Sequence, residues 1–232
     1  MKINEIYKLR SYNPSYDLKD YQNKYGNLET GWQKIPGDNP FYRARVIPYS
    51  SLPAFIIAVK TDAKRPLWKI VGGLNVAEMR IDNYYQKNMY GVGAIGVDPK
   101  YRGQGVAQHL YDGYLLPRPE GLDGILMAGD SQTSGGRAMW ANLKSRPDIE
   151  VTGWVKIAKG ESFGFNYSDE QMINFFSKVG GAYLGQSHYS WYFEFPVEKL
   201  PNKRELEIAV KGSGVKVYGG KSSTGLLARY LG

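Results

Sequence analysis

The stretch that decides the fold reads Gly93-Ala-Ile-Gly-Val-Asp-Pro-Lys-Tyr-Arg-Gly-Gln-Gly-Val-Ala107. Its apolar start predicts a strand, and the apolar residues from Val106 onward follow a helical period. A glycine-containing turn joins the two. A helix N-terminus carries backbone N–H groups without intrahelical partners and about half a positive charge. Because Gly103 and Gly105 let the backbone approach a ligand and Arg102 adds charge, the stretch predicts a pyrophosphate site.

The flanking sequence predicts sheet before this turn and alternating helices and strands after it. Three apolar runs predict an antiparallel meander: residues 54–59, 67–79 and 90–97. The following helix has an apolar face formed by Val106, Ala107, Leu110, Tyr111, Tyr114 and Leu115. Further apolar patterns predict a strand at 124–129, a helix at 134–144, a strand at 149–157, a helix at 168–179 and a strand at 191–197.

The two ends of the chain have weaker patterns. We expect a strand at residues 5–9 and a helix at residues 17–25 that ends at Gly26. Residues 200–232 are expected to form a C-terminal extension to a domain of residues 1–199. Within it, residues 206–210 and 215–217 predict a hairpin, and residues 226–231 predict one last helical turn.

Composition excludes several kinds of chemistry. The chain has 232 residues and no cysteine, which rules out disulfides, cysteine-ligated metal and a cysteine nucleophile. Only His109 and His188 remain as obvious zinc ligands, so we expect no zinc site and no other metal. His109 lies off the apolar face of its helix and is expected to face solvent. His188 has no readable partner, and Trp191, Tyr192 and Phe193 are typical of a sheet core.

Charge and hydropathy limit the partners. The net charge of +8 predicts attraction to an anion, whether nucleic acid, an acidic protein or a phosphate-bearing cofactor. The basic residues are scattered, however, and no nucleic-acid motif stands out. No apolar run is long enough to span a membrane, and no secretory leader is visible. We therefore expect a cytoplasmic protein.

The central motif resembles that of the GNAT superfamily, the GCN5-related N-acetyltransferases. In that family a strand ends in Val-x-Pro and is followed by (Arg or Gln)-x-x-Gly-x-(Gly or Ala). Here Val97-Asp98-Pro99 is followed by Arg102-Gly103-Gln104-Gly105-Val106-Ala107. The resemblance implies an α/β (α+β) fold, with a mixed, largely antiparallel sheet of six to seven strands flanked by helices. A Rossmann site fits less well because antiparallel strands precede the loop.

The resemblance also implies a reaction and a co-substrate. It implies transfer of an acetyl group from acetyl-CoA to a small amine or a protein amino group by direct attack. Residues 102–107 would hold the diphosphate. The backbone of Ile95, Gly96 and Val97 would bind the pantetheine, and the Val97 amide would polarise the thioester carbonyl. Ser134 would hydrogen-bond the pantetheine, and the sequence supports it equally as a helix N-cap.

Residues for proton transfer are less well defined. The general-base candidates are Glu78 and Asp82, and each is also typical of a surface carboxylate. Trp140 stands where the family has a tyrosine that protonates the leaving thiolate. Indole cannot donate that proton, so Trp140 either packs beside the sulfur or belongs to the core. Residues 130–140 resemble segments of GNAT proteins encoded by tailed phages.

Two alternatives to an enzyme remain open. One is a catalytically weak GNAT scaffold that binds its cofactor and modulates a partner protein. The other is a protein that binds or acylates a nucleic acid, which the basic surface would suit. The sequence indicates neither the acceptor nor the oligomeric state.

Overall fold

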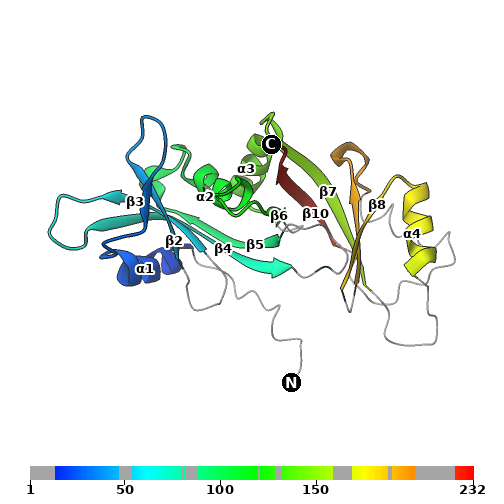
Figure 1. Cartoon of the computed structure of the whole chain (residues 1–232), viewed down its shortest axis with the longest axis horizontal. Coiled ribbons are helices and arrows are strands. Elements are labelled where there is room, and N and C mark those ends of the chain that lie inside the picture. The colour runs from blue at the N-terminus through cyan, green and yellow to red at the C-terminus, as the bar shows by residue number, and fades with distance from the viewer. Residues whose placement is uncertain are drawn as a thin grey trace, which may run out of the picture. The chain divides into compact units, whose positions relative to one another are not determined.

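Two compact units make up the chain. The computed structural model describes residues 14–46, 54–79, 81, 88–119, 121–128, 132–158, 169–187, 190–201 and 223–232. Unit 1 comprises Met1–Glu78 and Tyr90–Leu122, and unit 2 comprises Met79–Met89 and Asp123–Gly232. Each unit combines largely antiparallel strands with helices (Figure 1), so the predicted fold class is confirmed. The described residues form ten strands, however, where six or seven were expected.

Unit 1 is built on an antiparallel meander. Its elements are α1 (Pro14–Tyr25), β1 (Trp32–Lys34), β2 (Phe41–Val46), β3 (Ala54–Lys60), β4 (Trp68–Met79), β5 (Met89–Val97) and α2 (Val106–Leu115). The five strands follow one another in the order β1-β2-β3-β4-β5. Strands β3, β4 and β5 confirm the predicted meander, and α1 begins three residues before the predicted helix. Strands β1 and β2 were not predicted from the sequence.

Two adjacent glycines in β4 let helices pack closely on both faces of this sheet. A Cβ atom at Gly72 would lie 2.5 Å from Val106 Cγ1 of α2. One at Gly73 would lie 2.8 Å from Tyr21 Cε2 of α1. Because successive strand residues point to opposite faces, α1 covers one face and α2 covers the other (Figure 1).

Unit 2 contains the other five strands, together with two helices. Its elements are β6 (Ile125–Ala128), α3 (Ser134–Lys144), β7 (Ile149–Ala158), α4 (Asp169–Lys178), β8 (Ala182–Ser187), β9 (Ser190–Phe195) and β10 (Ser223–Tyr230). The strand order is β6-β10-β7-β9-β8. Strand β10 runs antiparallel to β6 and β7, and β9 runs antiparallel to β7 and β8.

The predicted helical turn at residues 226–231 is wrong. Residues 223–230 form β10, which pairs with β7 along its whole length and with β6 through Leu226, Leu227 and Ala228. Hydrogen bonding along both edges outweighs the local preference of this segment. The end of the chain is thus part of the sheet of unit 2. The boundary expected at residue 199 stays a prediction, and the expected strand at 5–9 and hairpin at 206–217 lie outside the described residues.

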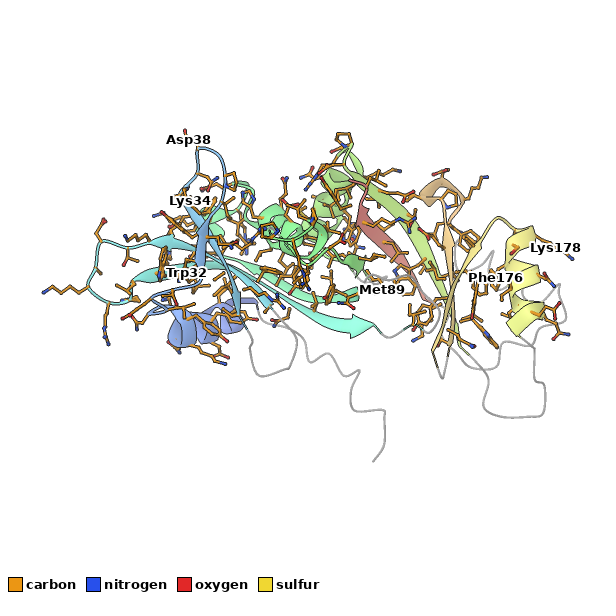
Figure 2. The ribbon with its side chains drawn as sticks, in the orientation of Figure 1. Trp32, Lys34, Asp38, Met89, Phe176 and Lys178 are labelled. Carbon is orange, nitrogen blue, oxygen red and sulfur yellow. The ribbon has the colours of Figure 1, made fainter. Side chains whose placement is uncertain are left out.

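Helix α4 packs on one face of the unit 2 sheet. Phe176 stacks on Phe193 of β9, with ring centroids 4.1 Å apart. Figure 2 shows Phe176 directed toward the strands and Lys178 directed away from them. The opposite face carries a second cluster that includes Trp154, Tyr192 and Leu227.

A side chain of β7 reaches across β10 in that second cluster. The indole Nε1 of Trp154 donates a hydrogen bond to the carbonyl oxygen of Ala128 in β6, at 2.9 Å. The indole passes over Gly225, where a Cβ atom would lie 2.5 Å from Nε1 and 1.9 Å from the Ala128 oxygen. Only glycine leaves room for this contact.

Candidate functional site

The loop between β5 and α2 is anchored at its first residue. Asp98 Oδ1 accepts a hydrogen bond from the Lys100 amide at 2.9 Å and thereby caps a single 3-10 turn, Pro99–Tyr101. Asp98 Oδ2 lies 3.0 Å from Lys69 Nζ of β4. Burial raises the pKa of Asp98, but the hydrogen bonds from Lys69 and Lys100 outweigh it and hold this pKa below its usual value. The start of the loop is therefore tied to the sheet by an ionised carboxylate.

Two glycines give the loop its shape. Gly103 and Gly105 have φ angles of +75° and +82°, a left-handed conformation that costs other residues about 1–2 kcal/mol. A Cβ atom at Gly103 would meet nothing within 4 Å, and one at Gly105 would lie 3.6 Å from His109 Nε2. Backbone conformation therefore favours glycine at both positions, and the space outside Gly103 is open.

The N-terminus of α2 has no side-chain cap. Gly105 is its N-cap residue, and the first turn contains no acidic residue. Arg102 is exposed beside it, with its Nε 3.4 Å from the carbonyl oxygen of Val97. A helix start without a competing carboxylate, next to an arginine and an open glycine turn, is suited to hold an oxyanion.

The end of β5 orients backbone donors away from β4. The Asp98 amide donates to the carbonyl oxygen of Val71 in β4, at 2.9 Å. Neighbouring amides along a strand point to opposite edges, so the amides of Val97 and Ile95 point to the edge of β5 that faces away from β4. These are the donors that the resemblance assigns to pantetheine.

The predicted cofactor-binding residues of unit 1 come together at one place. The end of β5 and the start of α2 gather Ile95, Gly96, Val97, Arg102, Gly103, Gln104, Gly105, Val106 and Ala107. Val106 is buried against the sheet, whereas residues 102–105 are exposed. Their role in binding stays a prediction.

The other predicted residues belong to different parts of the chain. Ser134 and Trp140 lie on α3 in unit 2, Ser134 exposed and Trp140 buried. The N-cap of α3 is Thr133, whose Oγ1 accepts from the Gly136 amide at 3.1 Å, so the N-cap interpretation of Ser134 is wrong. The side chain of Glu78 and all of Asp82 and His188 lie outside the described residues.

The environment of His109 was not anticipated. Its imidazole is half-buried, with the ring centroid 6.3 Å from that of Phe41, so the expectation that it faces solvent is wrong. Burial lowers its pKa below the usual value, Asp112 acts in the opposite direction, and Arg43 adds to the lowering. His109 and Asp112 line a cavity of about 450 Å³ beside α2. The sequence carries one sign of this arrangement, because His109 and Asp112 are three residues apart and residues with that spacing are neighbours on a helix.

Among the residues that the structure describes, no group of three or more His, Cys, Asp or Glu side chains is placed to hold a metal ion. No helix in the described ranges combines the length and the apolar character needed to cross a bilayer.

Comparison with known proteins gives structural similarities only. No family model matches the chain, and no curated protein matches it. One similar structure is a GCN5-related N-acetyltransferase from Kribbella flavida, with 16% identity, 56% of this chain and 29% of that chain covered, and a TM-score of 0.28. Another is Arabidopsis thaliana NAA60 in complex with a bisubstrate analogue, with 12% identity, coverage of 80% and 95%, and a TM-score of 0.29.

A third similar structure is larger than this chain. It is the fungal multi-domain GH3 β-N-acetylglucosaminidase with a GCN5-related glucosamine N-acetyltransferase region, at 15% identity and a TM-score of 0.28, with 74% of this chain covered. The chain spans 29% of the Kribbella protein and 20% of the fungal one. At these TM-scores the similarities carry no weight for function.

Proposed function

We propose that the chain is an N-acyltransferase that uses acetyl-CoA and holds its diphosphate on the loop 98–105 and the N-terminus of α2. One observation carries this proposal: two left-handed glycines precede a helix start that has neither a side-chain cap nor an acidic residue. The exposed Arg102 and the open space at Gly103 fit a phosphate group. No other described part of the chain combines these features with the strand-turn-helix motif.

The remaining residues have proposed parts in the same reaction. Acetyl-CoA supplies a thioester, which an amine attacks directly. The Val97 amide polarises the thioester carbonyl, a contribution that is typically worth about 3 kcal/mol. Glu78 or Asp82 takes the amine proton. Trp140 packs without donating a proton. The thiolate of coenzyme A leaves without that proton, because a thiol of pKa about 8.5 is a good leaving group.

Calorimetry with coenzyme A tests the binding step. Gly103→Asp and Gly105→Asp place a carboxylate where the diphosphate would lie, and we expect each to weaken binding more than tenfold. Gly180→Asp is the matched control, because Gly180 is also exposed, has a φ of +89° and belongs to unit 2. Equal affinity in all four proteins, or no heat with the wild-type chain, would refute the proposal.

Turnover separates an enzyme from a binding module. Release of thiol from acetyl-CoA in the presence of amines supports catalysis, and tight binding of coenzyme A without turnover across a broad amine panel supports the module. For an active chain, Glu78→Gln and Asp82→Asn should each be assayed against pH. The true base is the one whose loss removes the ascending limb of the rate profile, and unchanged profiles would exclude both.

A further inference from the structure

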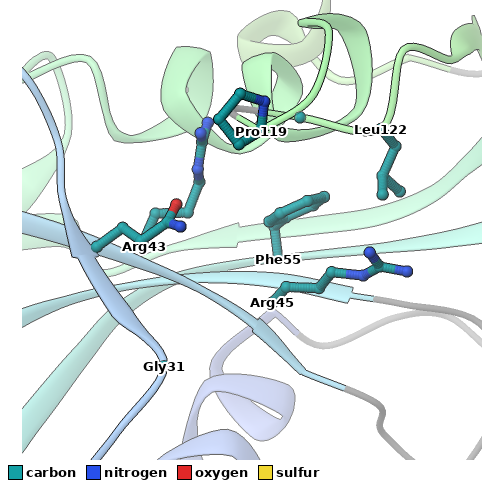
Figure 3. Close-up of a pocket in the computed structure, with 8 residues that line it drawn as sticks. Gly31, Arg43, Arg45, Phe55, Pro119 and Leu122 are labelled. Atoms are coloured by element: carbon teal, nitrogen blue, oxygen red, sulfur yellow. The ribbon is translucent and has the colours of Figure 1, made fainter.

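A basic pocket in unit 1 is lined by residues outside the glycine loop (residues 98–105). It has a volume of about 250 Å³, and its walls include Gly31, Arg43, Arg45, Phe55, Pro119 and Leu122. Figure 3 shows both arginines and Phe55 rising from the strands, with Pro119 and Leu122 on the segment that follows α2. None of the residues that line the pocket belongs to the loop 98–105.

The register of β2 and β3 brings the charged and aromatic side chains together. Arg43 and Arg45 are two residues apart on β2 and therefore point to the same face. Arg45 is the cross-strand partner of Phe55 on β3. All three side chains consequently lie on the face of the sheet that α2 covers.

The aromatic wall of this pocket is held firmly. The Phe55 ring packs edge-on against Tyr114, with centroids 5.0 Å apart, and a Cβ atom at Gly113 would lie 2.7 Å from it. The guanidinium carbon of Arg43 lies 5.6 Å from the Phe55 ring centroid, and its Nη1 donates to the His109 carbonyl oxygen at 3.3 Å. Arg43 is thus oriented by contacts with β3 and α2.

The charges in the pocket are of one sign. Its lining includes two arginines and no acidic residue. Arg45 is exposed, and no carboxylate in the described ranges forms an ion pair with it. Figure 3 shows the two guanidinium groups on different sides of Phe55, and Arg43 is already held by Phe55 and the His109 carbonyl, so Arg45 is the group that an anion would meet. The planar guanidinium group also matches the geometry of phosphate and carboxylate oxygens.

We propose that this pocket binds a small ligand that carries an oxyanion next to a planar ring, with the oxyanion on Arg45 and the ring against Phe55. Phosphate monoesters and aromatic carboxylates share this chemistry. The volume suits a ligand of that size, and the site goes beyond the proposed acyl transfer because it uses none of the same residues.

Ligand-detected NMR titration of the full chain with phenyl phosphate and with benzoate tests this proposal. We expect one or both to bind, and the better ligand identifies the oxyanion. Phenol, which lacks the charge, and inorganic phosphate, which lacks the ring, should each bind at least tenfold more weakly. Absence of binding by both phenyl phosphate and benzoate would overturn the proposal.

Variants locate the binding. Arg45→Gln should weaken binding at least tenfold, and because this side chain is exposed the fold should tolerate the change. Lys19→Gln removes the same charge from an exposed position on α1, which covers the opposite face of the sheet, and should leave binding unchanged. Equal losses in these two variants would show a nonspecific charge effect and refute the site.

One further pair of measurements separates this site from the glycine loop. Gly105→Asp should keep the affinity for phenyl phosphate or benzoate, and Arg45→Gln should keep the affinity for coenzyme A. Loss of the ring ligands in Gly105→Asp would place them on the loop and overturn the second site. Failure of coenzyme A to bind the wild-type chain would refute the proposed function alone.

Discussion

Burial of the His109 imidazole links the stability of unit 1 to pH. Its pKa in the folded chain lies below the usual 6.5, mainly because of burial and against the influence of Asp112. As pH falls through 6.5 the unfolded chain therefore takes up a proton before the folded chain does. The contribution of His109 to stability is fully present above pH 6.5. It is lost as the pH falls through 6.5 toward the pKa of His109 in the folded chain.

Urea unfolding at a series of pH values checks this expectation. The free energy of unfolding of the wild-type chain should decrease as pH falls from neutral to below 6.5, and His109→Gln should flatten that slope. Asp98 and Asp148 do not confound the measurement, because their pKa values lie below 3.8. If His109→Gln and the wild type keep the same slope, the imidazole does not control it.

Individual site residues could be predicted to different extents. Gly103 and Gly105 were found because a sequence motif fixes their positions relative to Val97 and Pro99. The reason for each glycine is a positive φ rather than tight packing, and only coordinates show this. The arginine pocket was missed because the pairing of Arg45 with Phe55 is a property of strand register, which a single sequence does not display.

Secondary-structure elements were predictable where a periodic pattern was long. Helix α3 has the predicted bounds, and α2 spans the predicted apolar face from Val106 to Leu115, since the apolar residues of both recur with helical spacing. Strand β1 has three residues, too few for any pattern, and β8 contains a register shift near Gly185. Strand β10 was misread because Leu226, Leu227, Ala228 and Arg229 are good helix formers, and only its pairing with β6 and β7 overrides that preference.

The contact between Trp154 and β6 predicts an unusual sensitivity at one position of β10. Gly225→Val would displace the indole and break its hydrogen bond to Ala128, and overpacking with a lost buried bond should cost about 3 kcal/mol. Thr224→Val introduces the same side chain one residue earlier and should cost much less. Urea unfolding measures both, and equal destabilisation by the two variants would contradict the proposed role of the gap at Gly225.

At the scale of the whole molecule, the two units differ in how far apart their paired strands lie in the chain. In unit 1, β2 pairs with β3 and β3 with β4, so neighbours in sequence are neighbours in the sheet. In unit 2, β10 pairs with β6 and β7, so Leu226 must find Ala128 across most of that unit. Long-range pairing slows folding because loop closure precedes any gain in contacts.

We therefore expect unit 1 to fold before unit 2. Pulse-labelling hydrogen exchange with mass spectrometry should show protection of β2, β3 and β4 amides before that of β6 and β10. Peptides from β9 and β8, which are sequence neighbours, give an internal comparison within unit 2. Simultaneous protection in both units would show that the chain folds as one cooperative body.

The bridge from Trp154 to Ala128 also supplies a spectroscopic probe. An indole proton held by a carbonyl in a dry interior exchanges slowly with solvent and gives its own resonance in a simple proton spectrum. Trp154 is expected to lose this signal when β10 detaches. The intensity of this one resonance, recorded without isotope labelling, would then measure the fraction of molecules in which β10 is paired.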